Sequence, residues 1–114
     1  MSTSSQKQAL LDAVSQLRSA EQLLLQATRA MSDPAKLIQA NTEYTHLDSC
    51  LSQMFHAQAL ADDATFDSAV TVLKQRSATL QADADAINAI IKDVAVGAKI
   101  IGYVTKAAQI IAAL

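Results

Sequence analysis

Hydrophobic residues return at helical spacing along most of the chain. In the first stretch they are separated by polar residues, so that a large apolar side chain occurs about once per helical turn. These positions are Leu10, Val14, Leu17, Leu24 and Met31. Because an α-helix has 3.6 residues per turn, such side chains gather on one face. The pattern predicts a first helix over about residues 6–31.

The second stretch begins after a clear boundary. Asp33 can cap a helix N-terminus, and Pro34 suits the first helical position, where its missing N–H costs nothing. From there two rows of mainly apolar residues repeat every seven positions, which is typical of a helix packed along a partner. The rows are Leu37, Tyr44 and Leu51, and Ala40, Leu47 and Met54. A second helix is predicted over about 34–61.

The remainder of the chain keeps a seven-residue step to its end. The row consists of Phe66, Leu73, Leu80, Ile87, Val94, Ile101 and Ala108. A continuous helix of that extent would be roughly 70 Å long, against roughly 40 Å for each of the first two. Gly97 and Gly102 offer a break, since a glycine inside a helix costs about 1 kcal/mol relative to alanine. Helices are predicted over about 64–96 and 98–114, either continuous or folded back on each other.

The composition favours helices over strands. Among the 114 residues are only two glycines and one proline, which hairpins and long loops need for their turns. A chain of this length forms one hydrophobic core. We therefore expect a single all-α domain over residues 1–114. It should be an antiparallel helical bundle of three long helices, the third extended or broken near Gly97–Gly102 into a fourth.

After Asp85 the hydrophobic side chains spread over most of the helix circumference. Residues 90–111 of this segment include ten large apolar side chains. If half of them stayed in water, the stabilisation lost would be roughly 7–15 kcal/mol, comparable with the stability of a whole domain. This segment predicts a non-catalytic interaction module that forms a homo-oligomer or binds a helical protein partner. The predicted interaction face is Ile90, Ile91, Val94, Ile101, Val104 and Ile111.

The polar stripe of the same segment suggests an alternative. Lys92, Lys99 and Lys106 stand seven residues apart and would share one side of a helix. A broad apolar face beside a lysine stripe is typical of helices that lie on anionic membranes. The alternative function is therefore a membrane-active amphipathic protein, acting at a lipid surface or as a pore-forming component.

Net charge and the N-terminal residues limit the partners and the cellular locations that we expect. The formal charge of -2 provides no general attraction to a phosphate backbone, so no nucleic-acid partner is expected. The first eight residues are polar and lack the apolar core of a secretory signal. We expect a cytoplasmic protein, or one exported without a cleaved signal peptide.

Glu43 and His46 have the Glu-x-x-His spacing that places two metal ligands on one helical face. A di-iron site needs a second copy of this motif and two further glutamates, whereas Glu21 is the only other glutamate. We therefore interpret Glu43 and His46 as solvated side chains, and we expect no bound metal ion and no other cofactor. Asp83 is likewise expected on a solvated face.

Cys50 follows His46 by four residues, a spacing at which a thiolate and a base can meet. Nucleophilic catalysis also needs a group that orients the histidine and a loop that stabilises an oxyanion. This glycine-poor sequence offers neither. Cys50 is interpreted as a half-buried structural cysteine and His56 as an exposed histidine. No catalytic residue is predicted, and we expect no enzyme activity.

Overall fold

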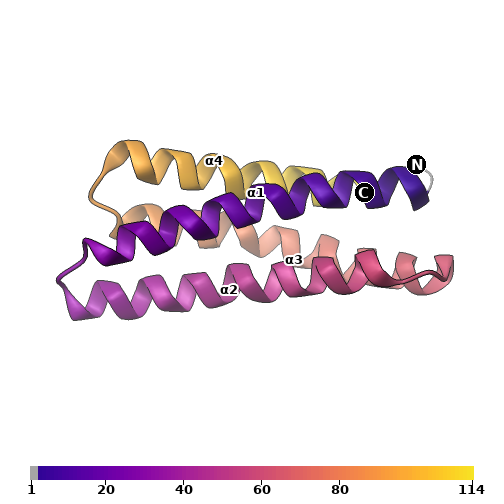
Figure 1. The fold of residues 1–114 in the computed structure, drawn as a ribbon, viewed down its shortest axis with the longest axis horizontal. Helices are drawn as coiled ribbons and strands as arrows, with labels where there is room; N and C mark the ends of the chain where they lie inside the picture. Colours follow the sequence, from indigo (N-terminus) through magenta and orange to yellow (C-terminus); the bar gives the residue numbers. More distant parts are fainter. Residues whose placement is uncertain (1–2) are drawn as a thin grey trace.

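Four antiparallel α-helices make up nearly all of the chain that the structure describes. A computed structural model describes residues 3–114, in which no strand occurs. The helices are α1 (Thr3–Arg29), α2 (Pro34–Ala59), α3 (Asp63–Ile90) and α4 (Val94–Ala112). Figure 1 shows them lying side by side, with α1 beginning and α4 ending at the same end of the molecule. The predicted all-α class and antiparallel bundle are confirmed.

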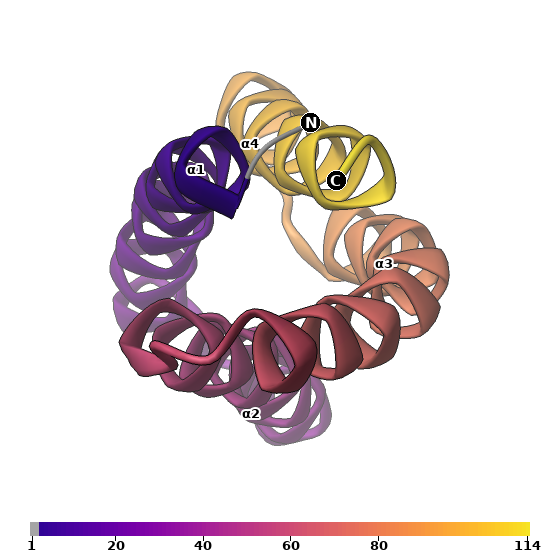
Figure 2. The ribbon, with the colours of Figure 1, turned by 90° about the vertical axis from the view of Figure 1, so that its right-hand side faces the viewer.

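The helices pack in a ring in which each helix contacts its two neighbours. The contacts join α1 to α2, α2 to α3, α3 to α4, and α4 back to α1 (Figure 2). The bundle measures 47 × 21 × 19 Å. Short connections between antiparallel helices produce this arrangement, since each helix then lies next to the one before it. The core runs along the axis between all four helices.

An aspartate caps each helix that follows a turn. Asp33 accepts a hydrogen bond from the Ala35 N–H at 3.0 Å. Asp62 accepts one from the Thr65 N–H at 2.8 Å, and Asp93 accepts from the second and third N–H groups of α4. These bonds satisfy amide groups that have no partner within the helix. The local sequence therefore determines where α2, α3 and α4 begin.

The predicted break near Gly97–Gly102 is wrong in its position. The chain turns at residues 91–93, so that α3 ends at Ile90, before the predicted residue 96. Gly97 and Gly102 both lie inside α4, and neither has a positive φ. The turn forms where Asp93 can cap a new helix, and the helical cost of the two glycines is tolerated within α4.

The turn also changes which residues face the core. Within α3, the predicted row from Phe66 to Ile87 is buried. Its continuation into α4 is not, because Val94 is 81% exposed and Ile101 is only partly buried. The buried positions of α4 are instead Gly97, Ile100, Val104, Ala107 and Ile111. A turn reverses the direction of the helix, so the seven-residue register of α3 has no reason to continue through it.

The two ends of the chain are joined by a side-chain hydrogen bond. The Gln6 amide donates to the carbonyl of Leu114 at 2.7 Å. Next to it, the Lys7 ammonium donates to the carbonyl of Leu60, which ends α2. These bonds hold α1 against its neighbours at the end of the bundle opposite the α1–α2 and α3–α4 turns.

Candidate functional site

The bundle itself covers much of the surface that the sequence analysis assigned to a partner. Val104 and Ile111 are fully buried against the other helices, and Ile90 is nearly so. Ile91 and Ile101 pack at the edge of the core, and Val94 alone among the six is strongly exposed. The predicted interaction face is therefore divided between the core, the edge of the core and one exposed residue, Val94.

The predicted lysine stripe lies on the surface. Lys92, Lys99 and Lys106 are all exposed to solvent. Lys92 belongs to the α3–α4 turn, and the other two lie on the outer side of α4. Only Lys99 and Lys106 therefore share one helix, and the predicted stripe of three is interrupted by the turn.

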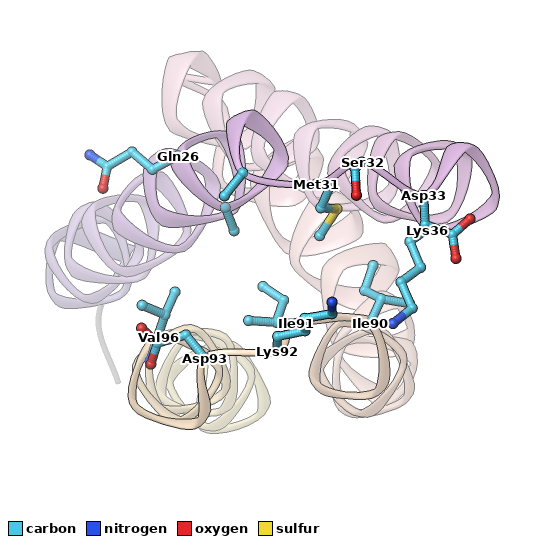
Figure 3. A pocket seen from close by; sticks show the side chains of 12 residues that line it. Gln26, Met31, Ser32, Asp33, Lys36, Ile90, Ile91, Lys92, Asp93 and Val96 are labelled. Atoms are coloured by element: carbon cyan, nitrogen blue, oxygen red, sulfur yellow. The ribbon is translucent and has the colours of Figure 1, made fainter.

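A hollow of about 390 Å³ opens at the end of the bundle where the α1–α2 and α3–α4 turns meet. Met31, Ile90, Ile91 and Val96 contribute apolar surface to it. Figure 3 shows these side chains together with Lys36 and Lys92, whose side chains lie near Ile90. Within residues 3–114, neither lysine makes an ion pair. Asp33 and Asp93 line the same hollow, so its rim carries both positive and negative side chains. Its apolar lining suits an apolar group.

A second hollow of about 340 Å³ adjoins the first between α2 and α3. Ile90 lines both hollows, and Ile38 lines the second. Ile38 and Val94 are the most exposed large hydrophobic residues among those described, at 68% and 81%. Both lie in the first turns of helices that begin at this end. We call this area, made of Ile38, Ile90, Ile91, Val94 and the two hollows, the loop-end surface.

A polar cluster lies between α2 and α3. Glu43 and His46 occupy one turn of α2, and Asp83 faces them from α3. His46 Nδ1 lies 3.1 Å from Asp83 Oδ1 and 3.5 Å from Glu43 Oε2. The Arg76 guanidinium donates to the backbone carbonyl of His46 at 3.1 Å. This arrangement differs from the solvated side chains predicted for Glu43, His46 and Asp83.

The cluster places two largely buried carboxyl groups beside one imidazole. The Glu43 and Asp83 side chains are only 14% and 11% exposed, whereas that of His46 is 46% exposed. Burial raises the pKa of Glu43, and the neighbouring Asp83 raises that pKa further. A carboxyl group in this position gains from any nearby cation or proton.

Asp83 was predicted on a solvated face, although its spacing indicates the opposite. Asp83 lies three residues after Leu80 and four before Ile87, and both leucine and isoleucine are buried. Residues at these spacings share a helical face, so Asp83 turns inward with them. The approach of α2 to that face depends on the tertiary fold.

Cys50 is fully buried, whereas the sequence suggested half burial. Burial raises the pKa of its thiol to about 11. The thiol is therefore protonated at neutral pH, and only the thiolate is a strong nucleophile. Cys50 is suited to packing within the core.

Glu21 is a second buried carboxyl, on α1. Its pKa is raised to about 7, first by burial and then by the nearby Asp48 carboxylate, while Tyr44 and Arg18 oppose the shift. Glu21 lies away from the loop-end surface and contributes to the pH dependence of folding.

Among the described residues, one helix, Val94–Ala112, is long and apolar enough to cross a membrane, although a core helix of a soluble protein can have the same properties.

No protein-family model matches this chain, and comparison with curated proteins and solved structures found no similar protein.

Proposed function

We propose that this chain is a non-catalytic helical interaction module whose loop-end surface binds an amphipathic helix of a partner protein. The observation that carries the proposal is a pair of adjoining hollows that share Ile90. The exposed Ile38 lines the second hollow, and the exposed Val94 directly follows Asp93, which lines the first. Exposed apolar surface next to hollows is typical of binding sites. Of the interaction face predicted from the sequence, Ile90, Ile91 and Val94 belong to this surface.

The two hollows favour a helix as the bound element. An amphipathic helix binds a groove through large side chains three, four or seven residues apart, each seated in its own depression. The hollows flank Ile90 and would receive two such anchors. Lys36 and Lys92 lie beside the first hollow together with Asp33 and Asp93. Polar residues of both charges should therefore flank the apolar anchors of the partner.

The size of the surface favours a transient complex over a stable dimer. The bundle is about 21 × 19 Å across its long axis. A cross-section of these dimensions has a smaller area than the roughly 800 Å² per partner that specific stable interfaces bury. A homo-oligomer formed through the same surface is the competing outcome, and it would appear as an increase of mass with protein concentration.

The proposal is tested with a fluorescein-labelled model helix built from leucine and glutamate, followed by fluorescence anisotropy. Binding should be saturable and weaker for Val94→Asp and Ile38→Asp. Val72→Asp is the matched control, since Val72 is exposed in the first half of α3, far along the helix from the loop-end surface.

Two results would contradict the proposal. One is a Val72→Asp loss equal to that of Val94→Asp, which would indicate non-specific adsorption. The other is an absence of binding by the acidic helix at every concentration tested. Light scattering on the same samples separates a hetero-complex from self-association.

A second candidate is contact with an anionic membrane, as the lysine stripe predicted. The length and apolar character of α4, together with the exposed Lys99 and Lys106, favour it. Binding to vesicles containing phosphatidylserine should then weaken with salt and in the Lys99→Glu, Lys106→Glu variant. Equal binding to uncharged vesicles, or none at low salt, would exclude this candidate.

A further inference from the structure

The Glu43–His46–Asp83 cluster has the composition of a metal site. It offers one imidazole nitrogen and two carboxylate oxygens, all within 4.8 Å of one another. Imidazole and carboxylate together are ligands for zinc and neighbouring divalent transition metals. Two of the ligands come from one turn of α2 and the third from α3, so a bound ion would join two helices.

Two of the three distances between the ligand atoms match the edges of a coordination shell, and the third, between Glu43 and Asp83, is within 4.8 Å. Zinc lies about 2.0–2.2 Å from nitrogen and oxygen ligands, so two neighbouring ligand atoms are about 3.0–3.5 Å apart. The corresponding distances from His46 Nδ1 are 3.1 Å to Asp83 and 3.5 Å to Glu43. A small inward adjustment of the side chains is enough to place an ion between them.

The cluster also lacks one positive charge. Glu43 and Asp83 are both largely buried, and within residues 3–114 the ion pairs of these carboxylates are with His46 alone. The buried Oε2 atom of Glu43 accepts no hydrogen bond. Arg76 is directed to the His46 carbonyl and not to a carboxylate oxygen. A buried polar atom without a hydrogen-bond partner indicates a missing ligand or proton.

We propose that Glu43, His46 and Asp83 bind one divalent transition-metal ion, with zinc as the representative ion. His46 would coordinate through Nδ1 as the neutral tautomer that carries its proton on Nε2. The half-exposed side of His46 leaves room for water to complete the coordination shell. The ion would hold α2 against α3 and stabilise the folded state, because it binds the assembled ligands more tightly than the unfolded chain.

The site differs from the di-iron arrangement considered in the sequence analysis. It uses the Glu-x-x-His turn once and takes its third ligand from Asp83, so it holds a single ion. Glu43 also lines the second hollow of the loop-end surface. The model-helix assay is therefore run with a chelator, so that failure of either proposal can be recognised separately.

The test is calorimetric titration of the full chain with zinc at neutral pH. We expect one ion per chain and a melting temperature that rises with zinc and falls again with a chelator. Glu43→Gln, His46→Ala and Asp83→Asn should each weaken binding at least about tenfold. His56→Ala is the matched control, since His56 is the only other histidine and is exposed.

Cobalt provides a second readout that does not depend on stability. Cobalt bound to a nitrogen–oxygen site of low coordination number gives visible absorption, which should be lost in His46→Ala and retained in His56→Ala. Circular dichroism verifies that each variant is folded. The proposal is overturned if zinc gives no saturable heat, or if folded His46→Ala binds zinc as tightly as the native chain.

Discussion

Gly97 packs against Asn88 where α4 meets α3. A β-carbon built on Gly97 would lie 3.0 Å from the Oδ1 atom of Asn88 and about 4 Å from Ile91. Glycine thus allows the first turns of α4 to lie close to the last turns of α3. Gly102, on the same helix, has no atom within 4 Å of the corresponding position.

This difference predicts opposite outcomes for the same substitution. Gly102→Ala should stabilise the bundle by about 0.5–1 kcal/mol, because alanine favours the helix and finds open space. Gly97→Ala gains the same helical preference but must displace Asn88, so its net effect should be smaller or destabilising. Urea denaturation of both variants measures the difference. Equal stabilisation by the two substitutions would show that the contact with Asn88 is unimportant.

The burial of α4 predicts a large loss from truncating its inner side chains. Ile100→Ala should destabilise the fold by about 2–5 kcal/mol, because Ile100 is fully buried. Val94→Ala removes an exposed side chain and should change stability by less than about 0.5 kcal/mol. Chemical denaturation compares the two variants. A small effect at Ile100 would mean that α4 is not part of the core in solution.

Asp93 should set the start of α4. Asp93→Ala removes the acceptor for two helix N–H groups and should cost about 1 kcal/mol. Asp93→Asn retains a capping oxygen and should recover most of the loss. If alanine and asparagine behave alike in thermal denaturation, the cap does not stabilise the turn.

Glu21 predicts a fall in stability as the pH rises. Its pKa is raised to about 7 in the folded chain from about 4.5, so the folded state holds a proton that the unfolded state releases between these values. The contribution of Glu21 to the free energy of unfolding is therefore fully present below pH 4.5 and is lost as the pH approaches and passes 7. The loss should be on the order of 1–2 kcal/mol.

The pH effect is measured by urea denaturation of the native chain and Glu21→Gln between pH 4.5 and 8. The glutamine variant cannot ionise, so its stability should rise relative to the native chain across this range. Asp12→Asn, at an exposed position of α1, is the control and should follow the native chain. A constant difference between Glu21→Gln and the native chain would exclude a raised Glu21 pKa.

Cys50 should resist thiol reagents. Its thiol is buried and has a pKa of about 11, so modification by Ellman's reagent at neutral pH should be much slower in the native chain than in guanidinium. Modification of the folded chain at the rate of the unfolded one would make Cys50 a reactive group and would reopen the question of catalysis.

The sequence alone determined the local features of this protein. Apolar spacing predicted helices in the right order, and Asp33 with Pro34 marked the start of α2 correctly. These features depend on interactions within a few residues, such as capping bonds and the sharing of a helical face. For the same reason the scarcity of glycine and proline was enough to predict an all-α chain.

The tertiary structure decided which side of α4 faces the core and which polar groups meet. The seven-residue row suggested that Val94 and Ile101 continue the buried seam of α3, but the turn at residues 91–93 reversed the helix and buried Ile100 and Val104 instead. Asp83 meets His46 across 37 positions of sequence. Such contacts depend on how two helices approach each other, which periodicity within each helix does not specify.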